Sequence, residues 1–109
     1  MRAFSGQWDI VSSPDLTAED LDVDGPSYVR LRLIGERLEG EFCLGACRGQ
    51  LDGRPDGDTG CLFSFEGVDG EQLVSGAATA LLENDVLRLR LLYHFGPSHT
   101  FACRRSSAA

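Results

Sequence analysis

Two histidines and four cysteines are the side chains of this sequence best suited to bind a metal or to act as nucleophiles. His94 and His99 flank the turn residues Gly96 and Pro97 and are expected to be direct cross-strand neighbours. Two imidazoles on one face of a hairpin can hold a metal where further ligands converge. Cys103 lies farther along the same strand, and no other ligand is evident. We therefore predict no metal site and interpret the histidines as a solvent-exposed pair.

The cysteines do not have the spacing of a zinc motif. Cys43 and Cys47 are separated by three residues, whereas a C-x-x-C motif has two between its cysteines. In a hairpin their thiols can approach each other, but along a continuous strand they lie about 13 Å apart. We interpret Cys43, Cys47, Cys61 and Cys103 as reduced residues of the core or near the surface.

An acidic segment resembles the start of a calcium-binding loop. Residues 20–25 read DLDVDG, and alternate carboxylates followed by glycine can converge on a hard cation. The twelfth position is Leu31, where such a loop needs a bidentate glutamate. The prediction for this segment is a solvated acidic turn.

No catalytic constellation is predicted. Nucleophilic catalysis needs Ser, Thr or Cys beside an oriented base, and both histidines are expected to point outward at one hairpin. Small barrels can nevertheless carry out cofactor-free isomerisation or cyclisation through shape and a few polar groups, so an enzyme stays open as a third interpretation. No catalytic residue and no cofactor are assigned.

Alternation of period two runs through nearly the whole chain and predicts β-strands. In DVLRLRLLYHF, for example, leucines and Tyr93 fall on one face and arginines on the other. Turn-forming Gly, Asp, Asn and Pro residues separate most of the runs. At Gly45 the apolar phase changes, which indicates either a tight turn or a bulge. The predicted strands are approximately residues 5–11, 27–34, 38–44, 46–52, 59–66, 73–82, 85–95 and 98–105.

One segment breaks the strand pattern and predicts a short helix after the first strand. Ser12 or Ser13 can cap its N-terminus, Pro14 suits the first turn, and Asp15 and Glu19 suit the positive end of a helix. We expect the helix over residues 14–21, where it would cap one mouth of the fold.

A chain of 109 residues is long enough for one domain and too short for two. We assign residues 1–105 to a single domain and residues 106–109 to a disordered tail. Eight sequential antiparallel strands leave two exposed edges unless the first strand pairs with the last. The sequence therefore predicts an all-β fold, a single eight-stranded antiparallel up-and-down barrel.

Trp8, the only tryptophan, is expected at the end of this barrel with Phe4, Gly6 and Ile10 on the same inward face. Across the last hairpin we expect Leu89 to lie opposite Arg104, which places Arg104 on the inward face as well. Its guanidinium can then stack on the indole and bind carbonyl groups at the barrel end.

A GxW motif in the first strand with an arginine late in the last strand resembles the calycin superfamily, which includes lipocalins and fatty-acid-binding proteins. A resemblance to a family of small uncharacterised bacterial β-barrel proteins covers nearly the whole chain, through GQW, PSYV, GEFCLGACRGQLDGR, FSFEG, SGAA and FACRR. That family has the pattern GxW, PxY, GxFxFGxxxGxxD and FxWxG, ending in an arginine pair. This chain departs from it around Leu16 and Thr17 and has Phe65 in place of tryptophan. The resemblance implies a barrel fold and no mechanism.

The net charge of −7 excludes some classes of partner. Nucleic-acid-binding proteins carry a basic surface, and an acidic protein is repelled by anionic lipids. The N-terminus MRAFSGQWDI lacks the apolar stretch of a signal peptide, and no run approaches the about 20 apolar residues of a membrane span. We predict a cytoplasmic protein that binds neither nucleic acid nor membranes.

The leading functional prediction is a non-enzymatic protein that binds a small, partly apolar or carboxylate-bearing ligand inside the barrel, beneath residues 14–24. An eight-stranded barrel is at the size where side chains fill the interior or leave room for one small ligand. The small side chains of residues 75–80 permit a pocket or contact with a second subunit. The alternative is a protein-interaction module or homodimer that acts through the acidic residues 15–24 or this small-residue strand. The residues predicted to line or close the ligand site are Trp8, Tyr28, Phe42, Phe63, Tyr93 and Arg104.

Overall fold

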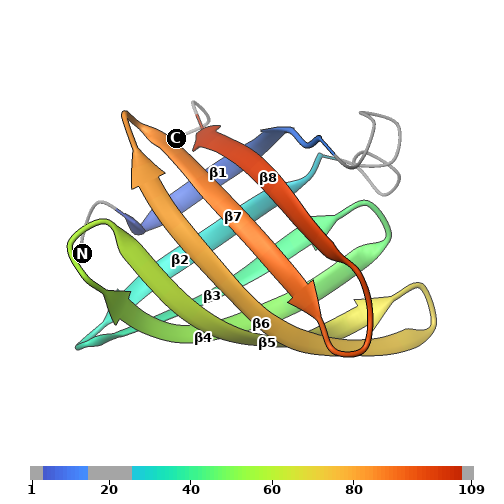
Figure 1. Ribbon diagram of the computed structural model, residues 1–109. Helices are drawn as coiled ribbons and strands as arrows, with labels where there is room; N and C mark the ends of the chain where they lie inside the picture. Colours follow the sequence, from blue (N-terminus) through green and yellow to red (C-terminus); the bar gives the residue numbers. More distant parts are fainter. Residues whose placement is uncertain (1–3, 15–25, 107–109) are drawn as a thin grey trace.

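The computed structural model describes residues 4–14 and 26–106 and shows a closed antiparallel barrel of eight strands (Figure 1). Each strand pairs with the next one in the sequence, and the last strand pairs with the first, so the predicted up-and-down barrel is confirmed. The strands are β1 (Gly6–Ser12), β2 (Tyr28–Ile34), β3 (Arg37–Leu44), β4 (Cys47–Asp56), β5 (Gly60–Asp69), β6 (Gln72–Glu83), β7 (Val86–Tyr93) and β8 (Ser98–Arg105).

The up-and-down connections divide the turns between the two ends of the barrel. The turns β3–β4, β5–β6 and β7–β8 lie at one end, to the right in Figure 1, and the chain leaves β1 and enters β2 at this end. Pro14 is described as a bend, whereas the rest of the predicted helix and the calcium-like loop fall within residues 15–25, outside the described residues. Among the described residues, no helix is long and apolar enough to cross a membrane.

The barrel closes through β1, which is hydrogen-bonded on both sides. Trp8 lies opposite Val29 of β2 and opposite Arg105 of β8. The β1–β8 register shifts between Ile10 and Ser12, which is where the strand bulges. No open strand edge is left between the first and last strands.

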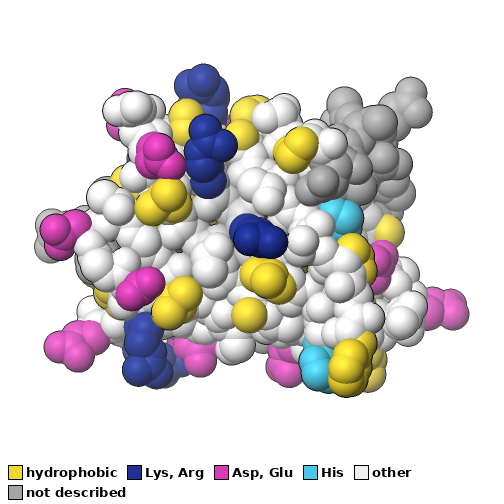
Figure 2. Space-filling view, viewed as in Figure 1, with side chains coloured by type: hydrophobic (Ala, Val, Ile, Leu, Met, Phe, Trp, Pro, Cys, Tyr) yellow, Lys and Arg dark blue, Asp and Glu magenta, His cyan; other side chains and the backbone are white. Residues whose placement is uncertain are grey.

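The core fills the interior of the barrel, as period-two alternation requires. Leu87, Leu89 and Leu91 of β7 are fully buried, whereas Arg88 and Arg90 between them are exposed. On the described part of the outer face in Figure 2, hydrophobic side chains are spread among polar ones.

Inward-facing glycines lie beneath aromatic rings of the neighbouring strands. A Cβ atom at Gly49 would lie 2.6 Å from the ring of Phe42, and one at Gly53 would lie 2.5 Å from the ring of Phe63. Each ring therefore occupies the space that a side chain on the next strand would take. This close packing explains why glycine stands inside long strands, where it is otherwise unfavourable.

The structure settles two of the predicted strand ends. We predicted a strand that ends at residue 52, but β4 continues to Asp56 and β5 begins at Gly60, because Gly53 packs beneath a ring and does not reverse the chain. Between β3 and β4, Leu44 lies opposite Cys47, and Gly45 has a φ of 60°. The change of phase at Gly45 is thus a tight two-residue turn.

The pairing predicted across the last hairpin is wrong. Leu92 lies opposite Ser98 and Leu91 lies opposite His99, so five residues reverse the chain where we expected a shorter turn. The observed register differs from the predicted one by three positions. An odd shift moves every side chain of β8 to the other face of the sheet. As a result, Phe101 and Cys103 are buried in the core.

Candidate functional site

Trp8 closes the barrel end that carries the N-terminal residues, as predicted. Its indole Nε1 donates a hydrogen bond to the carbonyl oxygen of Phe4 at 3.0 Å, and its side chain is 1 % exposed. The guanidinium carbon of Arg105 lies 4.4 Å from the centroid of the indole, and its Nη1 donates to the carbonyl oxygen of Ser5 at 2.7 Å. Arg105 thus makes the two contacts that we predicted for Arg104.

Gly6 and Arg105 account for the spacing of the GxW motif. Gly6 has a φ of 121°, a conformation that favours glycine, and a Cβ atom there would lie 3.0 Å from Nη1 of Arg105. The missing side chain gives the guanidinium its path to the indole of Trp8.

Arg104 is exposed on the outer face of β8, so its predicted inward position is wrong. The residues opposite it are Asp9 of β1 and Val86 of β7. The signal that would have found the correct arginine is the alternation of Phe101 and Cys103, which are the apolar residues of this strand. They put odd-numbered positions inward and therefore point to Arg105.

Inside the barrel, four rings form a chain of contacts with near-perpendicular planes. The ring centroids of Phe42 and Phe65 are 5.7 Å apart, those of Phe65 and Tyr93 are 5.3 Å apart, and those of Tyr93 and His99 are 5.9 Å apart. This edge-to-face arrangement is a favourable one for aromatic pairs. Phe42 and the nearby Phe63, both predicted ligand residues, are buried within this packed interior.

Tyr93, the third of these four rings, also contacts the thiol of Cys47. The Tyr93 hydroxyl donates a hydrogen bond to Sγ of Cys47 at 3.5 Å. Burial raises the pKa of Tyr93, and this hydrogen bond raises it further; burial also raises the pKa of Cys47. Both groups are therefore neutral at physiological pH, and Cys47 does not supply the thiolate of a nucleophile.

The histidines do not form the predicted cross-strand pair. His99 contacts the rings of Tyr93 and Phe101 on the inner side of the barrel, whereas His94 is exposed and lies against Phe95. All four cysteines are free and buried, in agreement with their interpretation as residues of the core or near the surface: Cys47, Cys61 and Cys103 belong to the core, whereas Cys43 lies beneath the outer face of β3. In the described part of the chain, no group of three or more His, Cys, Asp and Glu side chains is placed to hold a metal.

Tyr28, the remaining predicted ligand residue, lies on the outer face of β2, where a groove of about 910 Å³ crosses the sheet. Two rows of outward side chains line this surface, which we call the outer groove. In each row every residue lies opposite the next one on the adjacent strand. The first row is Tyr28, Cys43, Arg48, Val68 and Leu73, and the second is Glu41, Gln50, Glu66 and Ser75.

The outer groove combines apolar walls with charged groups. Val68 and Leu73 form one apolar wall, and Tyr28 stands at the opposite side of the groove. Arg48 lies in the middle of the first row, and Glu66 lies in the second row next to it. Within the described residues, neither charge takes part in an ion pair.

The tyrosine side of the outer groove is braced by a polar cluster. Arg30 donates hydrogen bonds to Oε1 of Glu41 at 2.7 Å and to Oε1 of Gln7 at 2.9 Å. The same guanidinium lies 5.2 Å from the centroid of the Tyr28 ring. These contacts hold Tyr28 in place on the surface.

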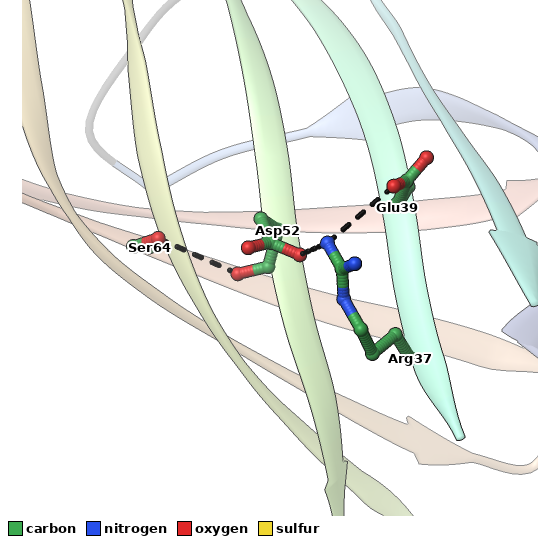
Figure 3. Close-up of polar contacts among 4 residues, drawn as sticks. All are labelled: Arg37, Glu39, Asp52 and Ser64. Atoms are coloured by element: carbon green, nitrogen blue, oxygen red, sulfur yellow. Dashed lines mark hydrogen bonds and ion pairs between the residues drawn. The ribbon is translucent and has the colours of Figure 1, made fainter. Parts of the chain in front are cut away.

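A second hollow, of about 1000 Å³, lies beside the outer groove and shares its second row. Three of its charges pair with one another, as Figure 3 shows: Nη2 of Arg37 contacts Oδ1 of Asp52 at 2.6 Å and Oε1 of Glu39 at 3.4 Å. The Ser64 hydroxyl donates to the backbone carbonyl of Asp52 at 3.5 Å. The hydrogen bond to Asp52 raises the pKa of Arg37. The paired charges of Arg37, Asp52 and Glu39 are less available to a charged ligand, although Arg32 and the shared Glu66 also line this hollow.

No family model, no curated protein and no solved structure matches this chain. Its class is defined by the fold, an all-β, eight-stranded antiparallel up-and-down barrel, which is compatible with a calycin-like barrel. The resemblance to the bacterial family stays a prediction, and so does an interaction through residues 15–24, which lie outside the described part of the chain.

Proposed function

We propose that this protein is a non-enzymatic barrel that binds a small, partly apolar ligand in the outer groove. The observation that carries the proposal is a groove of about 910 Å³ that places apolar walls around Arg48 and Glu66, two charges without an ion pair among the described residues. Ligand sites are typically concave, of about 300–1000 Å³, with apolar walls and a few oriented polar groups.

The packing of the interior favours the outer groove over the interior site. Trp8 is 1 % exposed, Phe42 is 2 % exposed and Phe63 is 5 % exposed, and the two phenylalanines lie against inward glycines. A ligand in the interior would have to displace these rings and lose their packing contacts. The outer groove needs no such rearrangement.

The arrangement of the groove also indicates the orientation of a ligand. An apolar body fits between Tyr28 and the wall formed by Val68 and Leu73. An anionic group, such as a carboxylate, can then accept charge-assisted hydrogen bonds from Arg48. This retains the predicted chemistry of the ligand but replaces Arg104 by Arg48 as the cation.

The proposal is tested by titrating the protein with 8-anilinonaphthalene-1-sulfonate, an aromatic anion, and following dye fluorescence. We expect saturable binding at one site per chain that Arg48→Gln weakens about tenfold, because a charge-assisted hydrogen bond is lost. Arg54→Gln is the matched control, since Arg54 is exposed on the same strand and does not line the groove.

Equal binding by the wild type and Arg48→Gln would contradict the proposal, as would an absence of binding. Binding that Tyr93→Phe weakens and Arg48→Gln does not would place the ligand in the interior and would also overturn the groove. Native mass spectrometry of gently purified protein complements the titration, since a ligand retained from the cell appears as added mass that is lost on denaturation.

A further inference from the structure

Phe95, at the tip of the β7–β8 turn, combines two costly features. Its side chain is 98 % exposed, and its backbone has a φ of 55°. A positive φ is unfavourable for a bulky residue, and an exposed phenyl ring leaves a large apolar surface in water. The next residue, Gly96, would tolerate this conformation at no steric cost, yet the strained position is occupied by Phe95.

Backbone hydrogen bonds fix the turn that carries Phe95. The amide of Gly96 donates to the carbonyl oxygen of Tyr93 at 3.0 Å, and the amide of Tyr93 donates to the carbonyl oxygen of Pro97 at 3.0 Å. The ring of Phe95 lies against the ring of His94, with centroids 4.2 Å apart. A strained residue that the surrounding structure fixes in this way is a common mark of a functional contact.

The turn that carries Phe95 adjoins the outer groove through its backbone. The amide of His94 donates to the carbonyl oxygen of Ser75 at 2.8 Å, and Ser75 lines the groove. Leu73, two residues before Ser75, belongs to the apolar wall and is itself 83 % exposed. The turn that carries the exposed ring and the outer groove are therefore neighbours along β6 and the end of β7.

We propose that two copies of this chain form a dimer in which Phe95 of each copy inserts into the outer groove of the other. A projection and a groove that lie side by side on one surface can pair reciprocally about a twofold axis, which gives a closed dimer with both contacts made twice. A second copy is the occupant to which the molecule itself gives an exposed aromatic ring for an apolar groove.

The chemistry of the groove matches that of the ring. Tyr28, Val68 and Leu73 offer apolar surface, and the guanidinium of Arg48 has no ion pair among the described residues. Arg48 can therefore stack on the phenyl ring of the other copy in a cation–π contact. The net charge of −7 on each chain opposes association at long range, so the dimer depends on short-range apolar contacts.

Sedimentation velocity over a wide range of protein concentrations tests the dimer. We expect the wild type to change reversibly from monomer to dimer, and Phe95→Asn to weaken association about a hundredfold or more, because two buried aromatic anchors are lost per dimer. Asparagine tolerates a positive φ, so this variant keeps the turn. Leu73→Glu, on the groove side, is expected to have a similar effect.

The matched control is Leu62→Asn, which removes another exposed apolar side chain that lies on β5 and does not line the groove. It should associate as the wild type does. Added salt should strengthen the wild-type dimer, because it screens the repulsion between the two acidic chains.

A wild type that stays monomeric at every concentration would overturn the proposal. A dimer that survives Phe95→Asn, or one that Leu62→Asn abolishes instead, would place the interface elsewhere and would overturn it too. The inference does not rest on the proposed ligand, because dye binding by monomeric Phe95→Asn is measured separately. Since both occupants use the outer groove, we expect the dye to shift the wild type toward the monomer.

Discussion

Arg105 joins the two termini of the chain at the seam of the barrel. One guanidinium lies over the indole of Trp8 and donates to the carbonyl oxygen of Ser5. The first is a cation–π contact with the face of the indole, and the second gives a hydrogen bond to a backbone carbonyl oxygen outside the strands. Its neighbour Arg104 makes neither contact, although the two residues are chemically identical.

We therefore predict that Arg105→Gln lowers the free energy of unfolding by about 1–2 kcal/mol, since a cation–π contact and a charged hydrogen bond are removed. Arg104→Gln, one position earlier, should change it by less than about 0.5 kcal/mol. Urea unfolding followed by far-UV circular dichroism measures both. Equal losses in the two variants would show that Arg105 has no special role in closing the barrel.

For individual residues, the sequence correctly predicted that Trp8 faces inward and that an arginine contacts it. The arginine predicted was Arg104, whereas Arg105 makes the contact. The error has a physical origin, because the identity of the inward residue depends on the parity of the β7–β8 register. That parity is set by how many residues the turn uses. Phe95 adopts a positive φ in this turn, which its residue type does not predict.

Among the elements, β4 and β5 depend on glycines that let rings of the adjacent strand pack against the backbone. A Cβ atom at Gly53 would meet the backbone carbonyl oxygen of Leu62 as well as the ring of Phe63. The backbone oxygen cannot move without disturbing the β4–β5 ladder. The backbone at Gly53 therefore leaves no room for a side chain.

Gly53→Ala is accordingly expected to lower the free energy of unfolding by about 2–4 kcal/mol, through overpacking against the backbone. In Gly60→Ala, the nearest atoms to the new Cβ are carbonyl oxygens at 2.9 Å from Asp56 and 3.6 Å from Ala80, so the loss should be clearly smaller. Thermal and urea unfolding of the two variants compare them directly. A Gly53→Ala variant as stable as the wild type would contradict the packing argument.

Period-two alternation predicted all eight strands, because each has one buried face and the pattern of burial is local in sequence. The predicted end of β4 at residue 52 was wrong, because a glycine that favours turns also permits close packing of strands. The outer groove was beyond sequence analysis for a related reason. Arg48, Val68 and Leu73 come from three strands, and only the observed registers place them in one row.

In the molecule as a whole, the buried thiols make the free energy of unfolding depend on pH in the alkaline range. Burial raises the pKa of Cys103 to about 12 and that of Cys61 to about 11, both from an ordinary value of 9.0. Above pH 9 the unfolded chain therefore loses these protons while the folded chain retains them. Because the folded state then binds more protons, the free energy of unfolding falls as pH rises.

We expect the urea midpoint to be insensitive to these thiols below pH 9 and to decrease steadily between pH 9 and pH 11. The double variant Cys61→Ala/Cys103→Ala should show a shallower decrease over the same interval, even though its cavities lower its stability at neutral pH. Identical slopes in the two proteins would show that other groups cause the alkaline loss.

The pairing of β8 with β1 also affects the order in which the parts of the barrel fold. The hydrogen bond from Arg105 to Ser5 joins residues 100 positions apart in the sequence. Contacts of such long range carry a large entropic cost of loop closure, so they slow folding and form late. The only tryptophan stands in this seam, beneath the guanidinium that completes it. The intrinsic fluorophore of this protein therefore lies at the seam where the pairing of β1 with β8 closes the barrel.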